Sequence, residues 1–159
     1  MNLSKNKLGL EGAKHLSEAV SQMKALIRLD LAENEIGDIG ICEIVKSLRD
    51  SGIIEHLDLS ANKIGKSSLG NECTENIRLL LHDNRLIECF KINWNSLRGV
   101  TGEKVIEGLV HCTSLKTIEL NNNLLGMGYE DSKEKDPAKR IKEPPICKLA
   151  ELLSTSHTL

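Results

Sequence analysis

The stretch LIRLDLAENEIG (26–37) recurs along the chain at a nearly constant spacing. Three later stretches follow the same order of apolar and polar residues: IIEHLDLSANKIG (53–65), IECFKINWNSLR (87–98) and LKTIELNNNLLG (115–126). Each contains the pattern apolar-x-x-apolar-x-apolar-x-x-Asn-x-apolar, and the first apolar residues of successive units lie 28, 33 and 28 positions apart. Such a fixed period predicts a fold of stacked, repeating units rather than a fold with one irregular core.

The first half of each unit predicts a short strand. Because strand side chains alternate between two faces, the two inner apolar columns point to one side and the residues between them point to the other. The inner columns comprise Leu29, Leu31, Leu57, Leu59, Phe90, Ile92, Ile118 and Leu120. These positions are expected to form the core behind the strands.

An asparagine follows each predicted strand, and one more, Asn6, lies 28 residues before Asn34, the asparagine of the first complete unit. The amide of an asparagine can both donate and accept hydrogen bonds, so we expect it to turn inward and bond backbone groups of its own and adjacent units. The structural asparagine ladder predicted in this way comprises Asn6, Asn34, Asn62, Asn95 and Asn123.

The turn after each asparagine usually ends in glycine, which suits a backbone with positive φ. The glycines expected in this conformation are Gly9, Gly37, Gly65 and Gly126. Arg98 occupies the equivalent position in one unit and Gly99 follows it, so the turn there should differ.

The second half of each unit has helical spacing. Apolar residues four positions apart, such as Ile44 and Leu48, recur before each following strand and mark the inner face of a short helix. Each unit is therefore expected to run from a short strand through a turn into a helix that returns to the next strand.

With these residues in place, the unit resembles a leucine-rich repeat. Its length of 28 residues and its Asn-x-Leu/Ile-Gly turn before a helix resemble the ribonuclease-inhibitor-like subfamily, which includes the Ran GTPase-activating protein and the repeat domains of NOD-like receptors. The resemblance implies an α/β fold: a right-handed solenoid shaped as a horseshoe arc, with parallel strands on the concave face and helices on the convex face. It says little about function, because fold and function separate.

We expect a single domain of about five repeats over residues 1–159, namely 1–25, 26–53, 54–86, 87–114 and 115–158. No polar capping unit is visible, so we expect a segment of a longer array. Two units carry insertions after the turn, within 66–73 and 127–145. The second is rich in charge and contains all three prolines, which indicates a solvated loop; it either carries function or is a tolerated surface insertion.

Composition excludes several classes of protein. The net charge of −2 argues against a nucleic-acid-binding protein, and no run of 18 apolar residues predicts a membrane span. The N-terminal stretch lacks the apolar region of a signal peptide. Five widely spaced cysteines suggest reduced thiols and a cytoplasmic location. Among them, Cys42 and Cys147 are expected to be exposed on the helices, and Cys112 to be buried.

The residues that alternate with the core columns should form a polar concave face. Asp30 and Asp58 are expected to be neighbours on it, and they repel each other unless a basic group lies between them. The sole tryptophan, Trp94, either presents its ring to a partner or packs across Ala61 of the neighbouring unit. The predicted partner-binding set is Arg28, Asp30, His56, Asp58, Lys91, Asn93, Trp94, Glu119 and Asn121.

These features favour a non-catalytic scaffold that binds a protein partner through its concave face and the rim between strands and helices. We expect no enzyme activity, cofactor, metal site, nucleic acid or small-molecule substrate. The alternative implied by the resemblance is a regulator similar to the Ran GTPase-activating protein, with Arg98 as its candidate rim residue. A sensor array of the innate-immunity type is a third reading, which the chain neither supports nor excludes.

Overall fold

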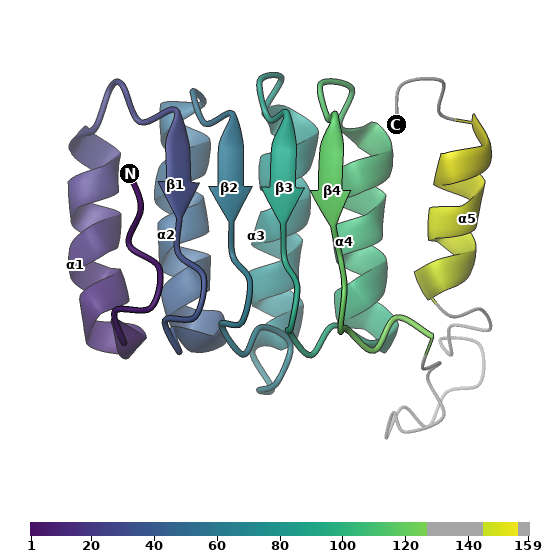
Figure 1. Ribbon diagram of the computed structural model, residues 1–159, viewed down its shortest axis with the longest axis horizontal. Coiled ribbons are helices and arrows are strands. Elements are labelled where there is room, and N and C mark those ends of the chain that lie inside the picture. The colour runs from purple at the N-terminus through teal and green to yellow at the C-terminus, as the bar shows by residue number, and fades with distance from the viewer. Residues whose placement is uncertain (127–144, 156–159) are drawn as a thin grey trace.

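The computed structural model describes residues 1–126 and 145–155 and shows a single sheet lined on one side by helices (Figure 1). Strands β1 (Arg28–Asp30), β2 (His56–Asp58), β3 (Cys89–Lys91) and β4 (Thr117–Glu119) are parallel and lie in sequence order. The helices are α1 (Gly9–Gln22), α2 (Gly37–Ser51), α3 (Gly70–Asp83), α4 (Gly99–His111) and α5 (Pro145–Thr155). The expected α/β repeat, with strands and helices in alternation, is confirmed.

The strands pair in the register that the sequence repeat predicts. Leu29 lies opposite Leu57, which lies opposite Phe90, and all three are at most 2% exposed. The helices complete this core with residues such as Ile44 and Leu48, both fully buried. Strand residues and helix residues thus form one continuous apolar layer between the sheet and the helices.

Two of the predicted core residues, Ile118 and Leu120, are only partly buried. They belong to the unit of β4, which is the last strand of the described sheet. Because each unit buries its inner face against its neighbours, a unit at the end of a sheet covers its core residues less completely.

The asparagines form a hydrogen-bonded ladder between units. Asn62 donates from Nδ2 to the carbonyl oxygens of Leu59 and Ser60 in its own unit and to that of Leu31 in the preceding one, at 3.2, 3.0 and 2.8 Å. Its Oδ1 accepts from the backbone N–H groups of Asn34 and Ile36 at 3.2 and 3.4 Å. Asn34 and Asn95 repeat this arrangement and are buried, whereas Asn6 is exposed and Asn123 is half-buried.

The turns that follow the ladder asparagines contain glycines with left-handed backbones. Gly9, Gly37 and Gly65 have φ values of 57°, 76° and 79°, as expected. In the unit of β3 the left-handed glycine shifts by one residue to Gly99, because Arg98 has extended backbone with φ −150°. The backbone N–H of Arg98 and the Thr101 hydroxyl then close a capping box at the start of α4.

The prediction of a positive φ for Gly126 is wrong, since its φ lies outside the left-handed region. Gly9 and Gly37 each donate their N–H to the carbonyl of the next unit's ladder asparagine, at 3.0 and 2.8 Å. The described residues give Gly126 no hydrogen bond of this kind.

A buried carboxylate organises the first insertion. Asp38, in the first turn of α2, is 4% exposed and accepts three hydrogen bonds from residues that precede α3. Its oxygens accept from the N–H of Gly65 at 2.7 Å and from the N–H and hydroxyl of Ser67 at 2.9 and 2.7 Å. The insertion predicted at 127–145 lies outside the described residues except for Pro145, the first residue of α5.

Helices α3 and α4 approach closely at Gly108. A Cβ atom added there would lie 2.9 Å from Cα of Arg78 and 3.0 Å from its carbonyl oxygen. A side chain at position 108 would therefore force the two helix backbones apart, since backbone atoms cannot yield as the end of a flexible side chain can.

We expect Asn62→Ala to lower the free energy of unfolding by about 1–3 kcal/mol, because buried backbone groups lose their partners. Urea denaturation checks this value. The control is Asn71→Ala, at an exposed position on α3, which should change stability by less than about 0.5 kcal/mol. Equal stabilities of Asn62→Ala and wild type would contradict the structural role of the ladder.

Gly108→Ala should lower the free energy of unfolding by about 1–3 kcal/mol through overpacking between α3 and α4. Thermal and urea denaturation measure the effect. Gly126→Ala is the matched control, since an added Cβ there meets no atom within 4 Å and its backbone is not left-handed. If both variants were as stable as wild type, the close approach of the two helices would be wrong.

Candidate functional site

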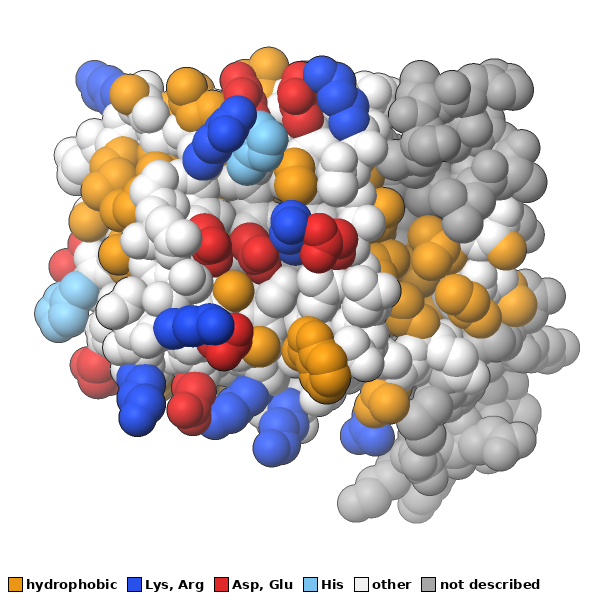
Figure 2. All heavy atoms as spheres, viewed as in Figure 1, with side chains coloured by type: hydrophobic (Ala, Val, Ile, Leu, Met, Phe, Trp, Pro, Cys, Tyr) orange, Lys and Arg blue, Asp and Glu red, His pale blue; other side chains and the backbone are white. Residues whose placement is uncertain are grey.

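The strand register assembles two rows of polar side chains on the sheet face, which we define as the side of the sheet opposite the helices. One row contains Arg28, His56, Cys89 and Thr117, and the next contains Asp30, Asp58, Lys91 and Glu119. Figure 2 shows acidic and basic side chains in a line across the four strands. The predicted partner-binding residues of the strands are thus brought together on one surface.

Asp30 and Asp58 lie directly opposite each other in adjacent strands. Each carboxylate accepts a hydrogen bond from the backbone N–H two residues further along the chain. Asp30 Oδ1 accepts from Ala32 at 3.0 Å, and Asp58 Oδ1 accepts from Ser60 at 2.9 Å. Within the described residues neither carboxylate has a basic nitrogen within 4.0 Å. Because parallel strands are about 4.8 Å apart, two like charges are held side by side without an ion-pair partner.

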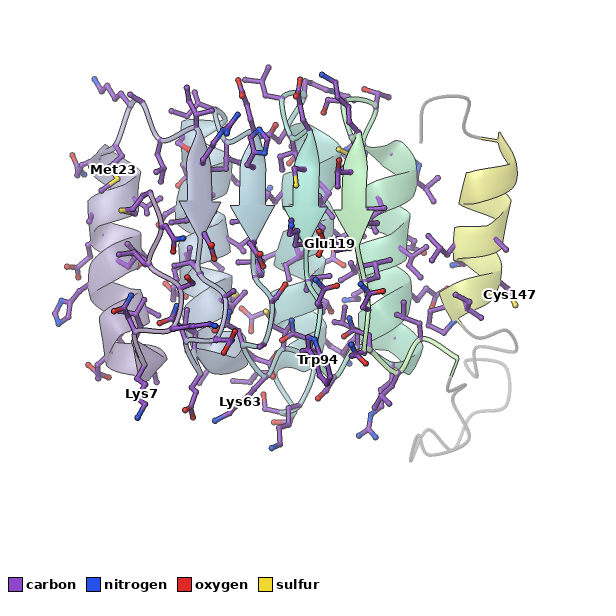
Figure 3. All side chains as sticks on the ribbon, viewed as in Figure 1. Lys7, Met23, Lys63, Trp94, Glu119 and Cys147 are labelled. Carbon is purple, nitrogen blue, oxygen red and sulfur yellow. The ribbon has the colours of Figure 1, made fainter. Side chains whose placement is uncertain are left out.

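The charges on β3 and β4 neutralise each other instead. Lys91 Nζ lies 2.6 Å from Glu119 Oε1, and Asn93 Nδ2 donates to Glu119 Oε2 at 2.8 Å. The hydrogen bond from Lys91, followed by that from Asn93, lowers the pKa of Glu119, while the same contact raises the pKa of Lys91. Figure 3 shows Glu119 on the sheet face, where β4 ends.

Asn93 also links neighbouring units through its backbone and side chain. Its Oδ1 accepts from the N–H of Asn121 at 2.8 Å, and its own N–H donates to the Ser60 hydroxyl at 3.1 Å. Asn93 and Asn121, both in the predicted set, therefore position the loop after β4 and the carboxylate of Glu119.

A hollow of about 380 Å³ lies over the N-terminal part of the sheet face. It is lined by Met1, Asn2, Arg28, Leu29, Asp30, His56, Leu57, Asp58, Cys89 and Lys91. Met1, Asn2 and Cys89 were not among the predicted site residues. The repeat places Cys89 in one row after Arg28 and His56 and Asn2 in the other before Asp30, so the sequence predicts both on this face although neither was in the predicted binding set.

The Cys89 thiol is a poor nucleophile in this hollow. Burial is the largest influence and raises its pKa, and this outweighs the opposite effect of Lys91. A protonated thiol is much less nucleophilic than a thiolate. We therefore interpret Cys89 as a residue that lines the hollow and not as a catalytic nucleophile.

Trp94 is 67% exposed and lies where the chain leaves β3 (Figure 3). Its φ of 54° is unusual for a bulky residue. The same left-handed conformation occurs in the other units at Lys5, Glu33, Ala61 and Asn122, each of which precedes a ladder asparagine. The ladder thus imposes a conformation that turns this residue away from the core. The high exposure favours a ring presented to a partner over a ring packed across Ala61.

The rim where strands pass into helices carries alternating charges. Lys5 and Glu33 lie 3.4 Å apart, and Lys63 and Glu35 lie 2.6 Å apart. Lys7 and Lys63 extend from this rim in Figure 3. Arg98 is exposed on the same rim, and its backbone is fixed by the capping box with Thr101.

The cysteines do not form a reactive or metal-binding set. All five are free thiols in the structure. The prediction that Cys42 is exposed is wrong: it is 5% exposed, because it lies between α2 and α3 near Glu72 and Asn76, and burial raises its pKa. Cys112 is buried, as expected. Across the part of the chain that the structure describes, no three His, Cys, Asp or Glu side chains are placed to hold a metal ion together.

Comparison with known proteins agrees with this geometry. A family model described as a leucine-rich repeat matches residues 24–44, which contain β1 and the first half of α2. No curated protein sequence matches the chain. The matched segment is similar to a leucine-rich repeat, and the fold is an α/β repeat consistent with a leucine-rich-repeat solenoid. No helix within the described residues is long and apolar enough to cross a membrane.

Lys91→Met should raise the pKa of Glu119 towards the usual value of about 4.3, because its main hydrogen-bond partner is lost. A lowered folded-state pKa stabilises the fold above the unfolded-state pKa, and this contribution disappears as the pH falls through the folded-state value. Wild type should therefore lose more stability than Lys91→Met on acidification below about pH 5.

Carboxyl ¹³C NMR titration measures the Glu119 pKa in each variant. The matched control is Lys116→Met, which removes the partner of Glu88 at 2.6 Å and should leave Glu119 unchanged. An equal Glu119 pKa in Lys91→Met and wild type would show that the ion pair does not form in solution.

Proposed function

We propose that this chain is a non-catalytic protein-binding scaffold whose partner lies on the sheet face and along the rim between strands and helices. Leucine-rich-repeat domains generally bind proteins, and the curved sheet of a solenoid offers an extended surface for this purpose. The observation that carries the proposal is the pair Asp30 and Asp58, aligned in register with no basic nitrogen within 4.0 Å in the described part of the chain. A partner that places a basic group between them removes their repulsion.

Trp94 supplies the second part of the proposed interface. Tryptophan is enriched among the residues that dominate binding energy, and its large ring gains most from being covered. In this chain the ring is 67% exposed on a backbone fixed by the asparagine ladder. Little conformational freedom of the backbone is therefore lost when a partner covers it.

The chemistry of the sheet face favours binding over catalysis. Paired carboxylates act as acid and base when a secluded pocket separates their pKa values. Asp30 and Asp58 instead line an open, mixed-charge hollow on a sheet surface. We propose that binding requires no cofactor, metal, nucleic acid or small-molecule substrate, and that the chain works in the cytoplasm, where free cysteines persist.

The alternative proposal is a GTPase-activating regulator resembling the Ran GTPase-activating protein, within the ribonuclease-inhibitor-like subfamily. The exposure of Arg98 at the rim supports it, because the capping box with Thr101 positions the start of its side chain. In this case Arg98→Ala should abolish stimulation of GTP hydrolysis without weakening binding of the GTPase.

The test is affinity capture from the source cell, with the complete protein as bait and circular dichroism as a check of folding. The disrupting variant combines Asp58→Arg and Trp94→Ala. The control combines Asp50→Arg with Val110→Ala, two exposed positions on α2 and α4, and so makes the same charge change together with a smaller loss of exposed apolar surface away from the sheet face. We expect a specific protein to be retained by wild type and the control and lost by the disrupting variant.

Retention by all three baits would contradict binding through the sheet face and would direct attention to the other surfaces. Loss from both variants would also contradict it, because the control leaves the sheet face intact. A small GTPase as the specific partner would favour the regulator, which the Arg98→Ala hydrolysis assay then tests.

A further inference from the structure

Two histidines meet on the helix layer, on the opposite side of the core from the proposed interface. His82 is in the last turn of α3 and His111 is the last residue of α4, and both are exposed. Their ring centroids are 5.6 Å apart, with the ring planes inclined by 50°. The two residues are 29 positions apart in the sequence and belong to successive repeats.

The close approach at Gly108 explains why these rings meet. The absence of a side chain at Gly108 lets the backbone of α4 pack against Arg78 of α3. Residues three or four positions further along lie on the same helix face. His82 follows Arg78 by four residues, and His111 follows Gly108 by three. Each histidine therefore lies about one turn beyond the Gly108–Arg78 contact, towards the C-terminal end of its helix.

Each ring uses Nδ1 for a hydrogen bond to an acceptor. His82 Nδ1 lies 3.0 Å from Asp83 Oδ1, and His111 Nδ1 lies 2.8 Å from the carbonyl oxygen of Glu107. An ionised carboxylate and a carbonyl can only accept, so the Nδ1 atoms carry the protons. In the neutral rings the lone pairs are therefore on the two Nε2 atoms.

This arrangement is typical of histidines that bind metal ions. A metal-binding imidazole usually donates its other N–H to a carboxylate or a backbone carbonyl, which fixes the tautomer and the ring orientation. Both partners occur here, one on each ring. Asp83 is itself fixed, because it accepts from Arg49 Nη2 of α2 at 3.1 Å.

The local field also favours a cation. Both rings lie at the C-terminal ends of helices, where the helix dipole is negative. Asp83 and Glu107 add two carboxylates nearby, which form ion pairs with Arg49 and Lys148 at 3.1 Å each. Among the described residues, the basic groups that face this cluster are Arg49, which binds Asp83, Lys148, which binds Glu107, and Arg78, which binds Glu75.

We propose that His82 and His111 form a two-imidazole site for a divalent transition metal ion of the zinc class, bound through both Nε2 atoms. Water molecules complete its coordination, since the described residues offer no third side chain at this place. The bound ion links α3 to α4 and thereby ties two successive repeats together. This site is independent of the proposed function and departs from the expectation that the chain has no metal site.

Isothermal titration calorimetry of the reduced, full-length chain with Zn²⁺ tests the proposal. We expect wild type to bind one ion that His82→Ala and His111→Ala each bind at least tenfold more weakly. His15→Ala is the matched control, because His15 is an exposed histidine on α1 whose one charged contact is Glu18, and it should bind as wild type does. Asp83→Asn should weaken binding about tenfold through the orientation of His82.

Proton–nitrogen NMR of the histidine rings in wild type provides a readout that does not depend on any variant. Without metal, both rings should show the Nδ1–H tautomer; with Zn²⁺, the Nε2 signals of His82 and His111 should shift together while those of His15 remain. Zinc binding unaffected by both alanine variants would overturn the proposal, because the ion would then reside elsewhere, at the cysteines for example. Protonation of the two rings with no zinc-dependent shift would overturn it as well, and would assign them to capping of the helix ends.

Discussion

The asparagine ladder is the interaction on which the rest of this structure depends. One side chain per unit donates to carbonyls of its own and the preceding unit and accepts from the preceding unit's N–H groups. These backbone groups lie beyond the strand ends, and burial makes them costly to leave unpaired. The ladder therefore fixes the register of the strands and the left-handed residue that precedes each asparagine.

The proposed binding surface is a consequence of that register. Because the units stack without slipping, identical positions of successive units form straight rows, and the chemistry of a row is set by one residue per unit. Asp30 and Asp58 are placed side by side in this way, and Lys91 is placed beside Glu119. The residue before each asparagine is turned outward by the same constraint, which exposes Trp94 although it is the largest side chain of the protein. The strain of its backbone is borne by hydrogen bonds elsewhere in the ladder.

The core and the rows of the sheet face could be predicted from the sequence because they repeat with a fixed period. The predictions were wrong where a residue's surroundings depended on what lies beside it in a neighbouring unit. Cys42 is buried because α3 covers it, and Ile118 is partly exposed because its strand is at the end of the described sheet. The role of Asp38 was not foreseen, since its partner Ser67 lies in the irregular insertion, next to its other partner Gly65.

The sequence by itself therefore determined the repeating strand–helix unit, the asparagine ladder and the membership of each row, because these follow from local periodicity and from side-chain alternation. Tertiary structure alone decided which of those rows carry unpaired charge and how far Trp94 is exposed. It also decided that His82 and His111 meet, through the contact of Gly108 with Arg78. Distances between helices of successive units depend on how closely two backbones pack, and that depends on side-chain volumes at their contact rather than on the period of the repeat.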